Sequence, residues 1–176
     1  MKSLTGHIRV LFTKEQIEVK VAELGKAITA HYEGKPLTVV GLTNGAMPFC
    51  ADLIRAIDLP MYVDTLSVAS YHADRRGDKF DFRSTLKLNP AGRSVLLVDE
   101  VLDSGMTLKH VSEYFMDKGV TDVRTAVMVV KDIPRSEGLS KPDWFGFEAP
   151  DGYLVGYGLD SMELYRNLPY IGVLEE

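Results

Sequence analysis

Cysteine is almost absent from the sequence, because Cys50 is the only one among 176 residues. A single cysteine cannot form an internal disulfide, and no set of Cys and His residues has the spacing of a structural zinc site. This usage is typical of a reducing cytosol. We therefore expect a cytoplasmic protein that folds without covalent or metal crosslinks.

Long hydrophobic runs are also missing from the chain. The longest apolar run, residues 126–130, is far shorter than the ~20 residues needed to cross a bilayer. The first dozen residues place His7 and Arg9 inside their only apolar stretch and hold no hydrophobic core followed by a small-residue cleavage site. We expect neither a membrane segment nor secretion.

Positive charge is in deficit. Lys and Arg number 20 against 25 for Asp and Glu, which gives a net charge of -5. Such a chain lacks the overall field that non-specific nucleic-acid binding requires. Hydrophobic residues make up 45% and charged residues 26%, the composition of an ordinary globular protein. A length of 176 residues then predicts a single domain over residues 1–176.

The hydrophobic pattern alternates between strand and helix. Thr13 and Gln16 have the spacing of a capping box, and the apolar residues that follow at three- and four-residue steps predict a helix ending near Gly34. Strands are expected at residues 37–42, 61–69, 93–98 and 123–130, with further helices around residues 49–57 and 108–115. Strands that are apolar on both faces and separated by helices indicate an α/β fold: a Rossmann-like, mostly parallel sheet flanked by helices.

Two segments depart from this alternation. Residues 70–83 are dense in charge and predict a long loop, either a solvated hairpin or a functional lid. From Trp144 onward, glycines, aromatics and short apolar pairs predict short strands. We expect a core over about residues 13–143 and a small C-terminal hood over about residues 144–176, joined by the N-terminal segment.

The loop after the third strand is where the sequence indicates chemistry. Open parallel sheets bind ligands beyond the carboxyl ends of their strands. Residues 103–107 place a glycine and two hydroxyl residues at the start of a helix, where free N–H groups favour a phosphate. Asp99 and Glu100 precede them. A ribose, which donates hydrogen bonds from its hydroxyls, a hydrated Mg²⁺, or both would offset the repulsion between these two carboxylates. Alternatively, Asp103 or Ser104 only caps the helix.

A family resemblance favours the ligand-binding interpretation. Residues 95–108, Val-Leu-Leu-Val-Asp-Glu-Val-Leu-Asp-Ser-Gly-Met-Thr-Leu, resemble the phosphoribosyl pyrophosphate signature of type I phosphoribosyltransferases. In order and spacing, residues 42–46, 131–136, 141–151, 155–160 and 165–168 are similar to segments of hypoxanthine-guanine phosphoribosyltransferases. The resemblance runs from about residue 37 to residue 173.

The resemblance implies a role for each matching position. The 5′-phosphate would be bound by Asp103, Ser104, Gly105, Met106 and Thr107; ribose and metal by Asp99 and Glu100; pyrophosphate by Thr43, Asn44, Gly45 and Arg166; and the purine by Lys131, Trp144, Phe145 and Asp151. Asp103 would be the acid/base at purine N7, Lys131 the donor to the 6-oxo group and Trp144 the stacking aromatic. Asp151 would hold a second Mg²⁺. Ser70 and Tyr71 would begin the lid.

Most of these residues also have an ordinary structural interpretation when each is taken alone. Lys131 could be a solvated charge at a strand end, Trp144 a core residue and Arg166 a surface ion pair. The functional interpretation is favoured because all the segments occur together in the order and spacing of the family.

Three positions depart from the family pattern. Thr43-Asn44 stands where relatives usually have Lys-Gly, at a peptide bond that is often cis in the family. Met106 stands where relatives often carry Lys or a small polar residue, and Asp99-Glu100 reverses the commoner order.

The implied reaction transfers the phosphoribosyl group from phosphoribosyl pyrophosphate to hypoxanthine or guanine with Mg²⁺, giving IMP or GMP and pyrophosphate. The alternatives are an enzyme that prefers xanthine and a nucleic-acid-binding regulator on the same fold. The net charge of -5 and the presence of Asp103 weigh against the regulator. The resemblance also implies a homodimer or homotetramer, with no nucleic-acid or membrane partner.

Overall fold

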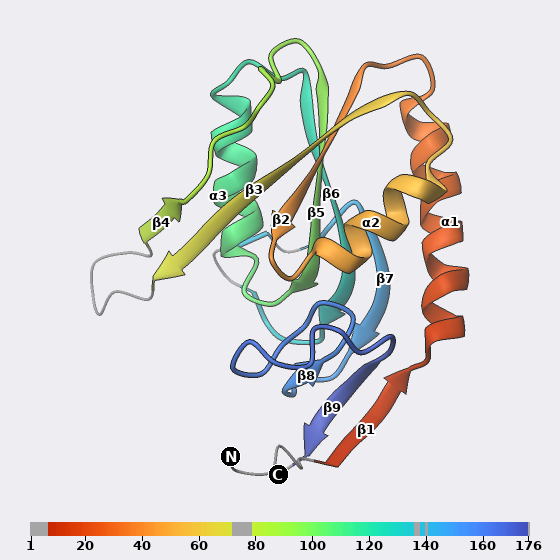
Figure 1. The fold of residues 1–176 in the computed structure, drawn as a ribbon. Helices are drawn as coiled ribbons and strands as arrows, with labels where there is room; N and C mark the ends of the chain where they lie inside the picture. The colour runs from red at the N-terminus through yellow and green to blue at the C-terminus, as the bar shows by residue number, and fades with distance from the viewer. Residues whose placement is uncertain (1–6, 72–78, 136–137, 140, 176) are drawn as a thin grey trace.

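The computed structural model describes residues 7–71, 79–135, 138–139 and 141–175, which form two sheets and three helices (Figure 1). The larger sheet has six strands in the order β4-β3-β2-β5-β6-β7. These strands are β2 (Leu37–Thr43), β3 (Met61–Tyr71), β4 (Lys79–Phe82), β5 (Ser94–Leu102), β6 (Asp122–Lys131) and β7 (Trp144–Ala149). All neighbouring pairs are parallel except β3 with β4, which is antiparallel. The expected α/β fold with a mostly parallel sheet is confirmed.

Helices cover both faces of this sheet. On one face, α1 (Lys14–Tyr32) and α2 (Met47–Ala56) pack over a core that includes Ile28, Phe49 and Leu96. On the other, α3 (Met106–Met116) packs its Phe115 side chain into a core that includes Leu97 of β5. The central strands are buried on both sides, which is why their sequences are nearly continuous apolar runs. No helix in the described ranges is both long and apolar enough to cross a bilayer.

The predicted capping box begins α1. The Thr13 N–H donates to Gln16 Oε1 at 2.8 Å, and the Gln16 N–H donates back to Thr13 Oγ1 at 3.4 Å. The helix ends at Tyr32, just before the turn at Gly34 and Pro36. The sequence therefore located this helix at both ends.

The second sheet is small and antiparallel, in the order β1-β9-β8. It joins β1 (His7–Phe12), β8 (Leu154–Val155) and β9 (Ile171–Glu175), so the two ends of the described chain lie side by side (Figure 1). This sheet stands below the carboxyl ends of the large sheet's strands in Figure 1. We call residues 150–175 together with β1 the hood.

The expected loop over residues 70–83 is shorter than predicted, and its two ends agree with the hairpin interpretation. β3 continues to Tyr71, and β4 pairs with it in antiparallel orientation from Val68↔Phe82 to Tyr71↔Lys79, while residues 72–78 lie outside the described residues. One expectation about the sheet was wrong. The hood does not begin at Trp144, because β7 pairs in parallel with β6 in the large sheet. The glycine and aromatic residues of β7 resemble those of the hood, and for this reason a strand of the large sheet was assigned to the hood.

Candidate active site

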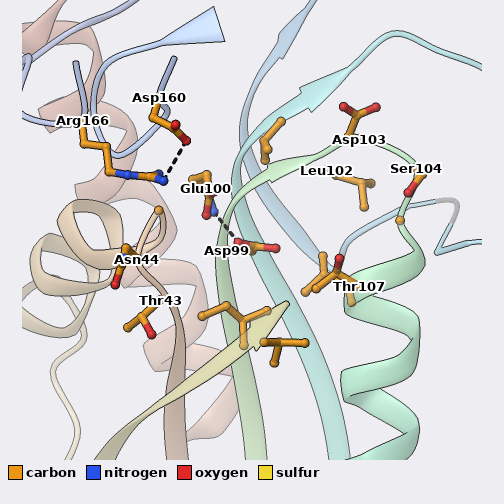
Figure 2. A pocket seen from close by; sticks show the side chains of 16 residues that line it. Thr43, Asn44, Asp99, Glu100, Leu102, Asp103, Ser104, Thr107, Asp160 and Arg166 are labelled. Carbon is orange, nitrogen blue, oxygen red and sulfur yellow. Dashed lines mark hydrogen bonds and ion pairs between the residues drawn. The ribbon is translucent and has the colours of Figure 1, made fainter. Parts of the chain in front are cut away.

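A cavity of about 300 Å³ opens at the carboxyl ends of β2 and β5, where an open parallel sheet is expected to bind its ligand. Its polar lining comes from the turn after β2, the end of β5, the start of α3 and the hood (Figure 2). The lining residues with polar side chains or a glycine are Thr43, Asn44, Gly45, Asp99, Glu100, Asp103, Ser104, Gly105, Thr107, Asp160 and Arg166. The structure thus gathers most of the expected site residues around one space.

The start of α3 presents main-chain N–H groups to this cavity. Gly105 precedes the helix with φ of +77°, a left-handed conformation that side chains rarely adopt, and no side chain caps the helix from that position. Ser104 Oγ accepts only a long 3.4 Å hydrogen bond from the Met106 N–H. The first N–H groups of a helix lack intrahelical partners and carry the positive end of its dipole. Apart from this long contact, the start of α3 has no side-chain cap within the described residues, which is the arrangement expected of an anion site. Met106 does not line the cavity.

Two acidic side chains at the end of β5 lie beside this loop. Asp99 and Glu100 belong to the strand itself, which extends four residues beyond its expected end. Figure 2 shows Asp99 and Glu100 between the start of α3 and the turn at Thr43 and Asn44. Burial first, and then the charge of Glu100, raise the pKa of Asp99 well above its ordinary value. A nearby cation or a hydroxyl-rich ligand would relieve this repulsion.

The carboxylates fit a magnesium ion that also binds substrate oxygens. No group of three His, Cys, Asp or Glu side chains within the described residues could hold a metal ion unaided. Mg²⁺ usually takes one or two protein carboxylates and completes its shell with water and substrate phosphates. Asp99, Glu100 and Asp160 all line the cavity and supply oxygen ligands of that kind. This donor set is compatible with Mg²⁺.

Lys131 joins the phosphate loop to a second space. The Lys131 ammonium is 3.0 Å from Asp103 Oδ2 and 3.9 Å from Asp151 Oδ1, and its side chain is only 16% exposed. The Lys131 ammonium is therefore largely buried and paired with carboxylates, and is not a solvated charge at the end of a strand. It lines an adjoining cavity of about 200 Å³ that shares Glu100 and Asp160 with the first. The two cavities meet along these shared carboxylates.

Arg166 lies at the hood side of the first cavity. It pairs with Asp160 at 2.8 Å (Figure 2). It also donates to the Gly158 carbonyl at 2.7 Å and pairs with Glu163 at 3.0 Å. Its side chain is three-quarters buried, so it is more than a surface ion pair. An anion that enters the cavity would meet a guanidinium already fixed in place.

The turn after β2 lies next to Arg166 and closes the side of the cavity that faces the start of α3 (Figure 2). The Thr43–Asn44 peptide bond is cis, as the family resemblance implied. Gly45 follows in close contact with β5, because a Cβ at this position would lie 1.9 Å from Glu100 Oε1. A larger residue here would displace the Glu100 carboxylate from its position beside the turn.

Sequence reasoning misplaced the aromatic contact to a base. Trp144 is the first residue of β7 and packs against His31 and Tyr32 of α1, with ring centroids 5.2 and 6.0 Å apart. Its main chain pairs with Ala126 in the middle of β6, and neither cavity is lined by Trp144, which is partly buried against the core under α1. Phe145 is also too early in β7, since its main chain pairs with Val127 in the middle of β6.

Two residues that sequence reasoning missed occupy the expected places. Tyr153 is 58% exposed and lines the second cavity with Lys131. Asp160 lines both cavities, whereas Asp151 lines neither and has a side chain that is 76% exposed. A tyrosine directly after Gly152, in a segment rich in glycine, was the sequence signal available for Tyr153.

The predicted lid lies only partly within the described structure. Ser70 and Tyr71 are the last residues of β3, and Val68 of the same strand lines the first cavity. The strand therefore leads the chain away from the cavity edge toward residues 72–78, which lie outside the described residues.

An anion-binding helix start beside two carboxylates, at the carboxyl edge of a parallel sheet, defines a sugar-phosphate-binding α/β protein. Residues 9–162 match the phosphoribosyl transferase domain, and the chain belongs to this family. Among its relatives, the hypoxanthine-guanine phosphoribosyltransferase of Bacillus subtilis (strain 168) is 38% identical over 168 residues, covering 95% of this chain and 93% of that protein. The protein of the same name from Lactococcus lactis subsp. lactis (strain IL1403) is 38% identical over 172 residues, covering 95% and 91%.

Solved structures agree with this membership. A hypoxanthine phosphoribosyltransferase from Staphylococcus aureus superposes with a TM-score of 0.90 at 36% identity, covering 95% of this chain and 91% of that one. The similarity therefore extends over both the large sheet and the hood.

Proposed function

We propose that the protein is a purine-salvage transferase that moves the 5-phosphoribosyl group from phosphoribosyl pyrophosphate to hypoxanthine or guanine. The products would be IMP or GMP and pyrophosphate. The observation that carries this proposal is the junction of two cavities: an anion-binding loop with a carboxylate pair on one side, and Lys131 with Tyr153 on the other. A sugar phosphate and a 6-oxopurine joined at the ribose would fill that junction.

The first cavity suits the sugar phosphate and the leaving group. Main-chain N–H groups and hydroxyls of Ser104 and Thr107 would bind the 5′-phosphate, with Gly105 allowing close approach. Asp99 and Glu100 would accept hydrogen bonds from the ribose hydroxyls, and these carboxylates and that of Asp160 would each be available as an oxygen ligand to Mg²⁺ that is bound mainly through substrate oxygens. When bound, Mg²⁺ supplies positive charge next to the pyrophosphate oxygens. The turn of Thr43, Asn44 and Gly45, together with Arg166, would bind pyrophosphate.

The second cavity suits the base. The Lys131 ammonium would donate to the 6-oxo oxygen, and the Tyr153 ring would stack on the purine. Asp103 lies 3.0 Å from Lys131 and would take the N7 proton as the glycosidic bond forms. The transition state has a cationic sugar, which the carboxylates would stabilise. We propose that residues 70–83 close over the site to exclude water.

The comparisons favour 6-oxopurine salvage over the alternatives. Relatives at 35–38% identity are named for hypoxanthine and guanine, which favours neither a preference for xanthine nor a nucleic-acid-binding role. We also propose a cytoplasmic location, in keeping with the single buried Cys50, whose pKa burial raises to about 11.

A direct assay tests the proposed function. The protein is incubated with phosphoribosyl pyrophosphate, Mg²⁺ and, separately, hypoxanthine, guanine, xanthine, adenine or uracil, and nucleotide formation is followed. We expect products from hypoxanthine and guanine, and adenine and uracil serve as the controls for base selectivity. Absence of product from every 6-oxopurine would overturn the proposal.

A further inference from the structure

Arg135 makes contacts that the proposed reaction does not use directly. Its guanidinium donates to three main-chain carbonyl oxygens, those of Leu102, Asp103 and Lys131. Nε lies 2.5 Å from the Asp103 oxygen, and one terminal nitrogen lies 2.9 Å from the Leu102 oxygen and also contacts the Lys131 oxygen. Within the described residues, all of its hydrogen-bond partners are carbonyl groups.

These carbonyl groups belong to two strand ends that carry different parts of the site. Leu102 ends β5 and leads into the phosphate loop, whereas Lys131 ends β6. The main-chain pairing of β5 with β6 ends at Leu102↔Val130, so the segments that follow the two strands are not joined by it. Arg135 is therefore the polar connection that continues the β5–β6 pairing past the end of the sheet.

The chain that follows Arg135 also lies against the phosphate loop. The Leu139 N–H donates to the Gly105 carbonyl at 3.0 Å. A Cβ on Gly138 would lie 2.1 Å from the Ser104 carbonyl oxygen, so only glycine allows this approach. The loop is thus supported from behind by the segment that begins with Lys131.

We propose that Arg135 is a positioning residue that sets the spacing between Asp103 and Lys131. The inference rests on the proposed function, which gives these two side chains opposite roles on one purine ring. Their charged atoms are 3.0 Å apart, and each residue's own carbonyl oxygen is held by the same guanidinium. A planar guanidinium presents several donors in fixed directions, whereas a lysine ammonium is a single point of charge.

The spacing matters because the purine must meet both groups at once. The proton acceptor at N7 and the donor to the 6-oxo group have to match neighbouring atoms of one rigid ring. A misplacement of about 1 Å in such an arrangement can lower the rate by about 10²-fold. Removal of Arg135 is therefore expected to lower kcat more than it raises KM.

Three variants test the inference. Arg135→Ala removes all three hydrogen bonds, and Arg135→Lys keeps the charge without the planar fork. Arg124→Ala is the matched control, since Arg124 lies near the start of β6, whereas Arg135 follows the end of that strand. Arg124 pairs with Asp143 at 2.7 Å and is 46% exposed. Thermal unfolding of each variant separates loss of fold from loss of positioning.

We expect kcat to fall by about 10²-fold in Arg135→Ala and by about tenfold in Arg135→Lys, with Arg124→Ala close to the wild type. In a Lys131→Ala background, loss of Arg135 should cost far less than in the wild type, because the two act as a unit. Equal kcat values for Arg135→Ala and Arg124→Ala, full activity of Arg135→Lys, or additive effects in the double variant would each overturn the inference. If Arg135→Ala does not fold, Arg135→Lys carries the comparison.

A crystal structure of Arg135→Lys separates this inference from the proposed function. The 3.0 Å pair between Asp103 Oδ2 and Lys131 Nζ is expected to open in the variant. An unchanged pair would overturn the inference even if the wild type forms nucleotide. A wild type that forms no nucleotide would overturn the proposed function while leaving this distance to decide the role of Arg135.

Discussion

Asp99 is a carboxylate whose charge the fold disfavours. Its raised pKa arises from burial and from the neighbouring Glu100. In the unfolded chain Asp99 ionises near the ordinary value of 3.8, whereas in the metal-free native state it keeps its proton to higher pH. Between these two values the native state binds more protons than the unfolded state, so the free energy of unfolding falls as pH rises.

Asp99→Asn should therefore raise the melting temperature of the metal-free protein at pH 7. The amide cannot ionise, so the gain should shrink as the pH is lowered toward 4. Thermal unfolding across this pH range, without Mg²⁺, measures the effect. Asp58→Asn, at an exposed position on the surface, is the control. The same pH slope in Asp99→Asn and in the wild type would contradict the assignment.

Asp103→Asn should lower kcat by about 10² to 10⁴, the range typical of lost general acid/base catalysis. The main-chain N–H groups of the loop are unchanged, so phosphoribosyl pyrophosphate should still bind. Steady-state kinetics and a binding titration measure the two quantities. Asp117→Asn, at the far end of α3, is the control. Undiminished turnover would leave Asp103 only its ion pair with Lys131.

The site residues that sequence could identify are those that are close together in the chain. Asp99, Glu100 and the loop to Thr107 lie in one short segment, so their grouping around the cavity follows from local structure. Tyr153 and Asp160 come to the cavity only through the path of the hood. Trp144 was wrong because its ring packs against His31 and Tyr32 of α1, a tertiary contact that the local sequence does not report.

At the scale of whole elements, the ends of α1 rest on short-range interactions. Thr13→Ala removes the side chain that accepts the Gln16 N–H and should lower the free energy of unfolding by about 1 kcal/mol. Urea denaturation should show a lower midpoint with an unchanged slope. Lys14→Ala is the control, because the Lys14–Glu18 pair is largely exposed and contributes little. A Thr13→Ala midpoint equal to that of Lys14→Ala would contradict the capping role.

Periodicity placed the helices and central strands, whereas strand ends depended on tertiary pairing. β5 continues through Asp99 and Glu100 because its partner β6 runs on to Lys131, and a strand with hydrogen-bonding partners tolerates acidic residues that resemble a loop. β4 was missed because only Phe80 and Phe82 alternate with charged residues there. No local pattern reports what the neighbouring strand does.

At the scale of the whole molecule, we expect a homodimer or homotetramer. The family resemblance implies this state, and large apolar side chains stand exposed on α2 and β3, where Met47 is 55%, Tyr62 49% and Val63 45% exposed. Sedimentation equilibrium should give two or four times the chain mass of 19.6 kDa. A mass of one chain at every concentration would contradict the expectation. In that case Tyr62→Ser, which removes an exposed apolar side chain, should leave the measured mass unchanged.

The pairing of β1 with β9 affects the order in which the protein can be completed during synthesis. His7 and Glu175 are partners across nearly the entire chain, and contacts so distant in sequence form slowly. A nascent polypeptide stalled on the ribosome before Ile171 would possess every strand of the large sheet and the start of α3, yet its hood would lack the central strand that joins β1 to β8. Such an intermediate would have a complete phosphate loop and an incomplete hood, so we expect turnover to begin only after β9 has been synthesised and paired.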